Sequence, residues 1–171
     1  MTGERGRPQA TDPRRIFETF ERHGVEYIVI GGIAAIAHGS TRNTRDVDFV
    51  ASTDRPNLER LAAALRDLDA RLSDTDAHLL GIDVHDPETL GSGANFTMET
   101  DAGGLDFFND VPGAAPYDQL RDRALVIDLD GVTIRVAGRD DLIRMKQASG
   151  RPQDLDDIAA LTALDDRPDR N

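Results

Sequence analysis

The stretch VEYIVIGGIAAIAHGSTRNTRDVDFV, residues 25–50, decides the fold that the sequence predicts. A β-rich run from Val25 to Ile30 ends abruptly in a pair of glycines, and an Ala-rich helix is expected from about Ile33 to His38. Asp46 to Val50 places apolar side chains between acidic ones, which is typical of a strand with one buried face. The stretch therefore predicts a strand, a tight turn, a helix and a second strand in direct succession.

Helical and strand periodicities continue on both sides of this stretch. Leucines recur every three or four residues from Pro56 to Leu72 and predict the clearest helix, and Asp130-Gly131 between two β-rich runs predicts a hairpin. Residues 73–94 fit no pattern, because Gly, Pro, Asp and His interrupt them. The other expected elements are a helix from Asp12-Pro13 to Gly24, strands over 95–100, 105–108, 124–129 and 132–136, a loop over 109–117, and helices over 140–149 and 152–164.

This order of elements predicts an α/β (α+β) protein. We expect a small mixed β-sheet flanked by helices, with a short C-terminal helical pair. The predicted organisation is a disordered lead over residues 1–11, a core over 12–138, C-terminal helices over 139–165 that pack on the core, and a charged tail over 166–171.

Composition excludes several classes of protein. The 171 residues include no Cys, so a disulfide framework, a zinc–thiolate site and a Cys nucleophile are excluded. No apolar run approaches the ~20 residues of a membrane helix, and the polar, Arg-rich first residues lack a secretory signal, so we expect a cytoplasmic protein without membrane partners. The net charge of -12 argues against a DNA-scanning protein but leaves room for a local basic pocket.

The first candidate site is the pair Asp46 and Asp48. Residues i and i+2 of a strand point to the same face, so the two carboxylates are expected about 6 to 7 Å apart at Cα. Like charges at that separation repel unless a cation lies between them, and hard oxygen ligands suit Mg²⁺. A solvated strand edge is the alternative interpretation. Asp106, within Leu105-Asp106-Phe107-Phe108, adds a third strand-borne carboxylate, and the three together suit two-metal phosphoryl transfer.

Gly31 and Gly32 form the second candidate site. Glycines between a strand and a helix let the backbone approach a ligand, although such a pair is often only a tight turn. The sequence is neither a P-loop, since no Gly-Lys-Ser/Thr follows, nor a dinucleotide fingerprint, since the next glycine is Gly39.

Lys146 is the third candidate, because it is the only Lys among 20 cationic residues. On the helix expected over 140–149 its amine lies on the apolar face, which suggests a point charge directed at a phosphate. The alternatives are a Lys that reaches solvent or pairs with Asp157. Arg151 precedes a helix start, and Asp154 and Asp157 are as suited to orienting Lys146 and Arg151 as to contacting substrate.

The combination of these motifs resembles a known superfamily. The sequence resembles the nucleotidyltransferases of the DNA polymerase beta type in three features. These are a Gly-Gly pair, an Asp-x-Asp strand separated from that pair by residues 33–45, and a third Asp on a later strand. The stretch GGIAAIAHGSTRNTRDVDF looks most like the minimal nucleotidyltransferases related to the AbiEii toxins of bacterial toxin–antitoxin systems. These proteins similarly carry a Lys, an Arg and Asp residues on their later helices.

The resemblance implies transfer of a nucleoside monophosphate from an NTP to an acceptor hydroxyl, with release of pyrophosphate. It implies that Gly31 and Gly32 cradle the triphosphate, that Asp46 and Asp48 hold two Mg²⁺ ions, and that Asp106 binds one ion and deprotonates the acceptor. Lys146 is implied to contact the nucleotide.

The loop before Asp46 adds Arg42 and Arg45, which are placed to reach phosphate oxygens or RNA or simply to be solvated. With Arg144, Lys146 and Arg151 they are expected to form a local basic funnel. We therefore predict a Mg²⁺-dependent nucleotidyltransferase, the toxin of a toxin–antitoxin pair, whose acceptor is a tRNA 3′ end or a protein hydroxyl and whose partner is a cognate antitoxin. The alternatives are an enzyme that modifies an antibiotic or another small molecule, a nucleotide- or protein-binding module without turnover, and an α/β interaction domain.

Overall fold

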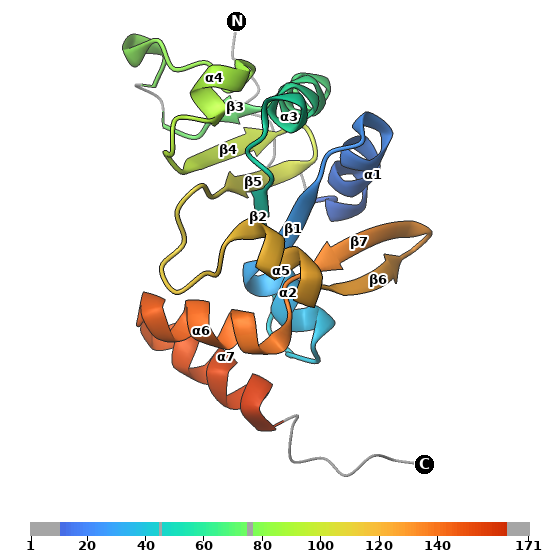
Figure 1. The fold of residues 1–171 in the computed structure, drawn as a ribbon, viewed down its shortest axis with the longest axis vertical. Coiled ribbons are helices and arrows are strands. Elements are labelled where there is room, and N and C mark those ends of the chain that lie inside the picture. The colour runs from blue at the N-terminus through green and yellow to red at the C-terminus, as the bar shows by residue number, and fades with distance from the viewer. Residues whose placement is uncertain (1–10, 45, 75–76, 164–171) are drawn as a thin grey trace, which may run out of the picture.

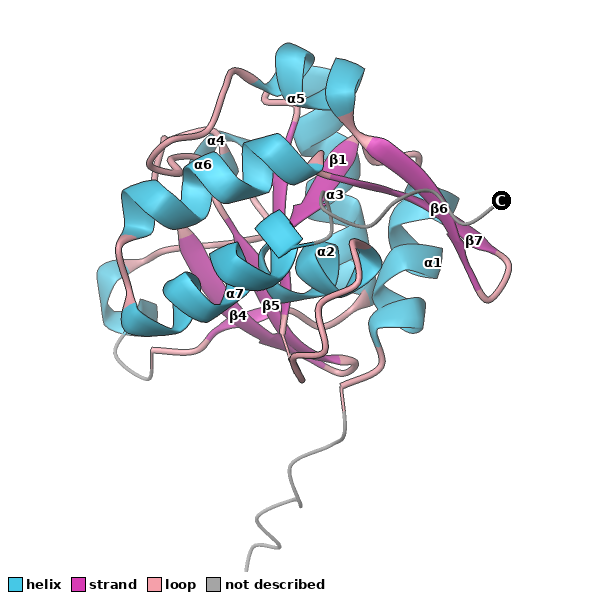
Figure 2. Cartoon of the chain, turned by 90° about the horizontal axis from the view of Figure 1, so that it is seen from below, coloured by secondary structure: helices cyan, strands magenta, loops and turns pink. Residues whose placement is uncertain are grey.

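The computed structural model describes residues 11–44, 46–74 and 77–163. It shows a seven-stranded mixed sheet flanked by helices, which confirms the predicted fold class (Figures 1 and 2). The helices are α1 (Pro13–His23), α2 (Gly31–Ala37), α3 (Arg55–Asp67), α4 (Pro87–Leu90), α5 (Tyr117–Arg123), α6 (Arg139–Ser149) and α7 (Pro152–Ala163), with a 3₁₀ turn η1 (Ala77–Leu80). The strands are β1 (Tyr27–Ile30), β2 (Val47–Ala51), β3 (Arg71–Leu72), β4 (Phe96–Thr100), β5 (Gly103–Phe107), β6 (Leu125–Leu129) and β7 (Val132–Val136).

The sheet order places the motif strands side by side at its centre. The strands follow the order β3-β4-β5-β2-β1-β7-β6. β1 runs antiparallel to β2, with Ile30 opposite Asp48, and β2 runs parallel to β5, with Asp48 opposite Asp106. The predicted hairpin joins β6 and β7, and Asp130 and Gly131 both have the positive φ that its tight turn requires. The sheet thus brings Asp48 and Asp106 to neighbouring positions.

The two faces of the central strands differ because side chains alternate along a strand. Val47, Phe49, Leu105 and Phe107 point to one face, where all four are buried. On this face Phe20 of α1 packs edge-on against Phe49, with ring centroids 5.1 Å apart. Asp48 and Asp106 occupy the intervening positions and therefore point to the opposite face. The hydrophobic core fixes the strands, and the opposite face carries Asp48 and Asp106 among buried apolar residues such as Ile30 and Val50.

Several predicted boundaries are wrong. The helix predicted to Leu72 ends at Asp67, because Asp69 adopts a positive φ and the chain turns back into β3. The helix predicted from Ile33 already begins at Gly31. Helix α5 begins at Tyr117, at the end of the predicted loop, and the unassigned segment 73–94 contains η1 and α4.

The last two helices pack against each other below the sheet in Figure 1, and α6 also contacts α2. Gly150 ends α6 in the left-handed conformation, with φ of 64°, so that α7 folds back beside it. The predicted tail over 166–171, and the predicted lead apart from Thr11, lie outside the described residues.

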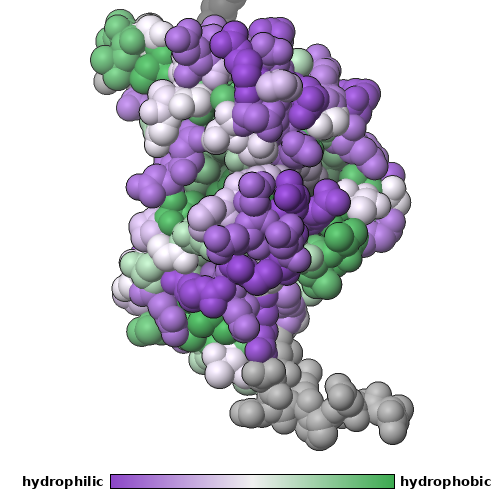
Figure 3. Space-filling model, in the orientation of Figure 1, coloured by the Kyte–Doolittle hydropathy of each residue, from purple (hydrophilic) through white to green (hydrophobic). Residues whose placement is uncertain are grey.

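The surface agrees with the charged composition. The face drawn in Figure 3 is mostly hydrophilic, and its hydrophobic residues form separate patches rather than one continuous area. Among the described residues, no helix combines the length and the hydrophobicity needed to span a membrane.

Candidate active site

Asp48 and Asp106 form the centre of the candidate site. They lie opposite each other on the parallel strands β2 and β5, and their carboxyl groups share a hydrogen bond. Thr97, opposite Asp106 on β4, also hydrogen-bonds to Asp106. Two strands far apart in the sequence therefore bring together the two acidic groups that sequence analysis singled out, with a neighbouring hydroxyl that orients one of them.

Asp46 lies beside this pair but outside the strand. Strand β2 begins at Val47, so the expectation that both residues of the Asp-x-Asp pattern lie within the strand holds for Asp48 alone. Asp46 is exposed, and its carboxylate lies so close to Gly104 of β5 that a Cβ at Gly104 would collide with it. The missing side chain at Gly104 therefore leaves room for the third carboxylate. We refer to Asp46, Asp48 and Asp106 as the sheet carboxylates.

The sheet carboxylates carry negative charge that the protein does not neutralise. Burial, the hydrogen bond to Asp106 and the negative charges of Asp106 and Asp46 raise the pKa of Asp48 to about 7, and Arg151 opposes this rise only in part. Burial and the charge of Asp46 likewise raise the pKa of Asp106, against hydrogen bonds from Asp48 and Thr97. Either a proton or a bound cation relieves this repulsion.

The two glycines after β1 fit closely around their neighbours. Gly31 has a φ of +66°, and a Cβ there would overlap the Asp48 carboxylate. A Cβ at Gly32 would lie 2.8 Å from the Thr44 side chain. Both positions therefore require glycine for a steric reason within the fold. The predicted contact of Gly31 and Gly32 with a triphosphate stays a prediction.

The C-terminal residues form a second, ion-paired group. The Asp157 Oδ2 atom accepts hydrogen bonds from Lys146 Nζ at 2.8 Å and from Arg42 Nη1 at 2.7 Å. Arg151 Nε donates to Asp154 Oδ2 at 3.1 Å, and Asp154 Oδ1 lies 3.8 Å from Lys146 Nζ. The pairing of Lys146 with Asp157 was one of the alternatives that the sequence left open. Arg45 lies outside the described residues.

The acidic members of this group stay ionised. Burial alone would raise the pKa of Asp154 and Asp157, but hydrogen bonds from Arg151 to Asp154, and from Lys146 and Arg42 to Asp157, hold the pKa of both below its usual value. We refer to Asp154, Asp157 and the similarly paired Asp141 as the helix carboxylates. Asp141 accepts hydrogen bonds from Arg123 and Arg144, which lower its pKa against the effect of burial.

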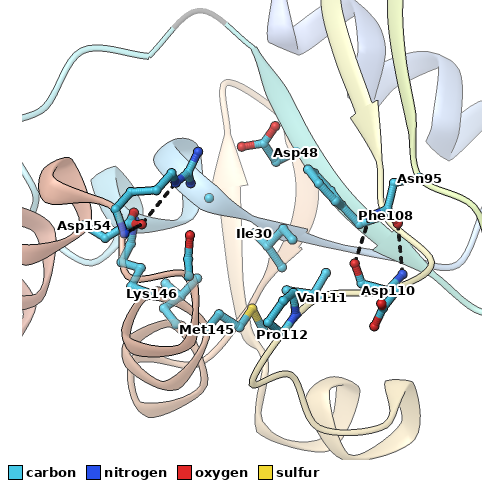
Figure 4. Close-up of a pocket in the computed structure, with 14 residues that line it drawn as sticks. Ile30, Asp48, Asn95, Phe108, Asp110, Val111, Pro112, Met145, Lys146 and Asp154 are labelled. Carbon is cyan, nitrogen blue, oxygen red and sulfur yellow. Dashed lines mark hydrogen bonds and ion pairs between the residues drawn. The ribbon is translucent and has the colours of Figure 1, made fainter.

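A cavity of about 370 Å³, here called the first cavity, connects the two groups (Figure 4). Five predicted site residues line it: Gly31, Asp48, Lys146, Arg151 and Asp154. In Figure 4, Lys146 and Asp154 approach from the C-terminal helices, Asp48 approaches from the sheet, and Phe108 to Pro112 close another side. The lining does not include Gly32, Arg42, Asp46, Asp106 or Asp157.

Sequence analysis missed most of the apolar wall of the first cavity. Phe108, Val111 and Pro112 fall in or beside the predicted loop, and Met145 and Leu142 read as core positions of α6. Asn95 also lines the cavity, and its side chain accepts hydrogen bonds from the backbone of Asn109 and Asp110. The pairing of Asn95 with the loop offers no local sequence signal, because the partners are far apart in the chain.

The donor chemistry of the sheet carboxylates suits a hard divalent cation. Among the described residues, no three acidic or histidine side chains surround one point as a complete metal site. Mg²⁺, however, often takes only one or two carboxylates and completes its shell with water and phosphate oxygens. The facing oxygens of Asp48 and Asp106, with charge that their surroundings leave unbalanced, fit that requirement.

Comparison with known proteins agrees with this geometry. Residues 14–167 match a family described as nucleotidyltransferase of unknown function (DUF6036). No curated protein matches the chain.

Solved structures share the fold at low sequence identity. The lincosamide antibiotic adenylyltransferase LnuA, solved with lincomycin bound, superposes with a TM-score of 0.60 at 15% identity, over 91% of this chain and 99% of LnuA. The enzyme ANT(2″)-Ia, solved with adenylyl-2″-tobramycin, superposes with a TM-score of 0.54 at 16% identity. The match covers 89% of this chain and 87% of ANT(2″)-Ia. A protein from Thermotoga maritima assigned as a nucleotidyltransferase superposes with a TM-score of 0.53 at 14% identity, over 91% of each chain. At these identities the likeness shows the fold alone.

Proposed function

This chain belongs to the DUF6036 family of nucleotidyltransferases, and from that premise we propose that it transfers a nucleoside monophosphate from an NTP to an acceptor hydroxyl in a Mg²⁺-dependent reaction. The observation that carries the proposal is the pair Asp48 and Asp106 on neighbouring parallel strands, beside a cavity that Lys146 and Arg151 also line. The site thus places uncompensated carboxylates and two cationic side chains at one cavity, as transfer at phosphorus requires.

Each group of residues has a distinct part in this chemistry. The sheet carboxylates would hold Mg²⁺, which when bound neutralises charge on the phosphate oxygens. Asp106 takes the proton from the acceptor hydroxyl as the acceptor oxygen forms a bond to the α-phosphorus. The bond between the α-phosphorus and the bridging oxygen to the β-phosphate breaks, and pyrophosphate leaves with that electron pair.

The cationic side chains bind the phosphates. Lys146 is 7% exposed and is fixed by Asp157, so its amine is oriented before the substrate arrives. Arg151 acts on Asp48 electrostatically and is held by Asp154. Preorganised charges of this kind stabilise the developing negative charge without reorganisation during the reaction. Gly31, beside Asp48, leaves backbone accessible to the triphosphate.

The resemblance to AbiEii-type proteins carries a finer proposal, in which the chain is a toxin that modifies a tRNA 3′ end or a protein hydroxyl and is neutralised by an antitoxin. One observation favours a small-molecule acceptor instead. The described cations of the expected basic funnel that do not line the first cavity are held by carboxylates, Arg42 by Asp157 and Arg144 by Asp141. A polynucleotide gains most of its binding energy from unneutralised cations, so this arrangement disfavours RNA.

A label-transfer experiment tests the proposal. Purified protein is incubated with each α-³²P-labelled NTP and Mg²⁺, in separate reactions with total bacterial RNA, a protein fraction, lincomycin and tobramycin. We expect label on one class of acceptor with the wild-type protein and none with an Asp46→Ala/Asp48→Ala variant. Label that is independent of Mg²⁺, or equal in the variant, would contradict the proposal.

A further inference from the structure

A second cavity of about 380 Å³ lies next to the first. It is lined by the end of β2, by the segment over residues 108–116 and by the start of α5. Phe108, Asp110 and Val111 line both cavities, so these three residues form a partition between them.

The strands place this second cavity directly beyond the sheet carboxylates. Val50 follows Asp48 by two residues, and Phe108 follows Asp106 by two, so each pair shares one face of the sheet. The hydrogen bond from Phe108 N to Phe49 O extends the β2–β5 ladder to this point. Two residues of a strand advance about 7 Å. A ligand in the second cavity therefore lies within the length of a small molecule from Asp48 and Asp106.

The two cavities differ in charge. Lys146 and Arg151 line the first cavity, whereas the described residues that line the second include no Lys, Arg or His. Displacement at phosphorus brings the entering oxygen in opposite to the leaving group. We therefore expect the pyrophosphate to bind beside Lys146 and Arg151 in the first cavity. The acceptor then binds on the opposite side of the sheet carboxylates.

We propose that the second cavity binds the acceptor, and that the acceptor is a small, phosphate-free molecule with a hydroxyl group, an apolar body and an amine. This inference rests on the proposed nucleotidyl transfer and supplies its acceptor class. The apolar body packs against Val50, Ala114, Ala115 and Leu120. The hydroxyl reaches past the partition to the sheet carboxylates.

Polar groups at the second cavity match such a molecule. Asp110 is the only charged residue in its lining, and no ion pair to its exposed carboxylate is found within the described residues. An amine on the ligand supplies that partner. Tyr117 also lines the second cavity, and its phenolic hydroxyl supplies a hydrogen-bond donor for the ligand.

The size of the second cavity supports a small acceptor. A volume of about 380 Å³ lies at the lower end of the range for small-molecule sites and holds a single ring system with its substituents. Several nucleotides of a tRNA end would need more space and cationic groups for their phosphates. The size of the second cavity therefore disfavours a macromolecular acceptor, which label on RNA or protein would reveal.

Three matched probes test the proposal by NMR on the full chain with ¹³C-labelled Ala methyl groups. The probes are phenylalaninol, 3-phenylpropan-1-ol, which lacks the amine, and 3-phenylpropyl phosphate. We expect the two alcohols to shift the signals of Ala114 and Ala115 saturably. Phenylalaninol should bind about threefold more tightly than 3-phenylpropan-1-ol, because its amine contacts Asp110. The phosphate ester should not bind there. Equal binding of the phosphate ester, or no saturable shift with either alcohol, would overturn the proposal.

A cavity-filling variant provides the second arm. Ala115→Leu should weaken binding of phenylalaninol at least tenfold, and Ala159→Leu, the same change on the exposed face of α7, should leave it unchanged. Tyr117→Phe, which removes only the hydroxyl, should weaken it severalfold. Equal binding by Ala115→Leu and the wild type would overturn the assignment to the second cavity.

The same sample separates this inference from the proposed function. A non-hydrolysable NTP with Mg²⁺ should bind to the wild type and to Ala115→Leu with equal affinity, because it occupies the first cavity. If that nucleotide does not bind, the proposed function fails. If it binds while label from the NTP passes to RNA or to protein rather than to small molecules, only the acceptor assignment fails.

Discussion

Asp48 and Asp157 are carboxylates near the same cavity, and they differ in what balances their charge. Asp157 Oδ2 accepts hydrogen bonds from two cations, Lys146 and Arg42, and its pKa is held below the usual value. Asp48 faces another carboxyl group, Asp106, and its pKa is raised to about 7. The helix carboxylates are thus neutralised within the protein, whereas the sheet carboxylates are not.

This difference separates a structural role from a binding role. In a buried ion pair each charge compensates the other, and removal of one member leaves the other charge unpaired in a medium of low polarity. A cluster of like charges costs stability unless a ligand compensates it, and such clusters are typical of functional sites. Substitutions should therefore harm function at the sheet carboxylates and stability at the helix carboxylates.

The largest expected effect is on activity at Asp48. Asp48→Asn keeps the shape of the side chain but removes the charge that would hold Mg²⁺, so nucleotidyl transfer should fall at least ~1000-fold. Circular dichroism and the thermal midpoint should show an intact fold. Initial rates with labelled NTP measure the loss.

The matched control is Asp128→Asn on the exposed strand β6, which should keep full activity. An Asp48→Asn protein that unfolds would show that Asp48 is a structural residue, and one that retains more than a tenth of the wild-type rate would show that transfer does not need its charge.

The next effect concerns the pH dependence of stability without Mg²⁺. Between about pH 4 and pH 7 folded Asp48 keeps a proton that the unfolded chain has released, so the free energy of unfolding should fall as pH rises through this window. The helix carboxylates have lowered pKa values, so their contribution to the free energy of unfolding is lost only below about pH 4. Urea unfolding at intervals from pH 4 to pH 8 measures the slope.

Asp48→Asn should remove most of this slope and be more stable than the wild type at pH 8. Asp157→Asn should keep the slope. A wild-type protein whose stability rises steadily from pH 4 to pH 7 would contradict the assigned difference between the two groups.

Local patterns in the sequence predict part of the fold and of the candidate site. The Asp-x-Asp pattern and the flanking apolar residues of β5 identified Asp48 and Asp106, because strand alternation is a local property. The hairpin at Asp130-Gly131 was equally local, since both residues must adopt a positive φ. The predicted order of the long elements is confirmed.

The remaining features depend on contacts distant in the sequence. Helix α4 contains four residues, too few for a periodic pattern, so segment 73–94 offered no signal. The start of α5 at Tyr117 and the partition between the cavities depend on how the chain after β5 packs across the sheet. The sequence allowed Lys146 to pair with Asp157 or to point at a phosphate, and only tertiary packing shows that the amine contacts Asp157.

A moderate loss of stability is expected at Asp157. Asp157→Ala removes the partner of a buried Lys146 and of Arg42, which should lower the free energy of unfolding by about 3 kcal/mol. Asp156→Ala, the adjacent exposed residue of α7, should change it by less than about 0.5 kcal/mol. Urea midpoints at pH 7 compare the variants.

The double variant Lys146→Met/Asp157→Leu tests the reason for this loss. It should recover much of the stability that Asp157→Ala loses, because the buried Lys146 amine is removed together with its partner. A double variant as unstable as Asp157→Ala would mean that the carboxylate stabilises α7 through a contact other than its pair with Lys146.

The smallest expected effect is on nucleotide affinity at Lys146, where the two groups meet. Lys146 belongs to the pair with Asp157 and also lines the first cavity beside Asp48. Lys146→Gln should raise the KM for the NTP about tenfold, which corresponds to ~1.4 kcal/mol, with a smaller change in kcat. Arg144→Gln removes a cation from the same helix outside the first cavity and should leave KM unchanged. A Lys146→Gln variant with reduced stability and an unchanged KM would place Lys146 wholly with the helix carboxylates, as a structural counter-ion without contact to the triphosphate.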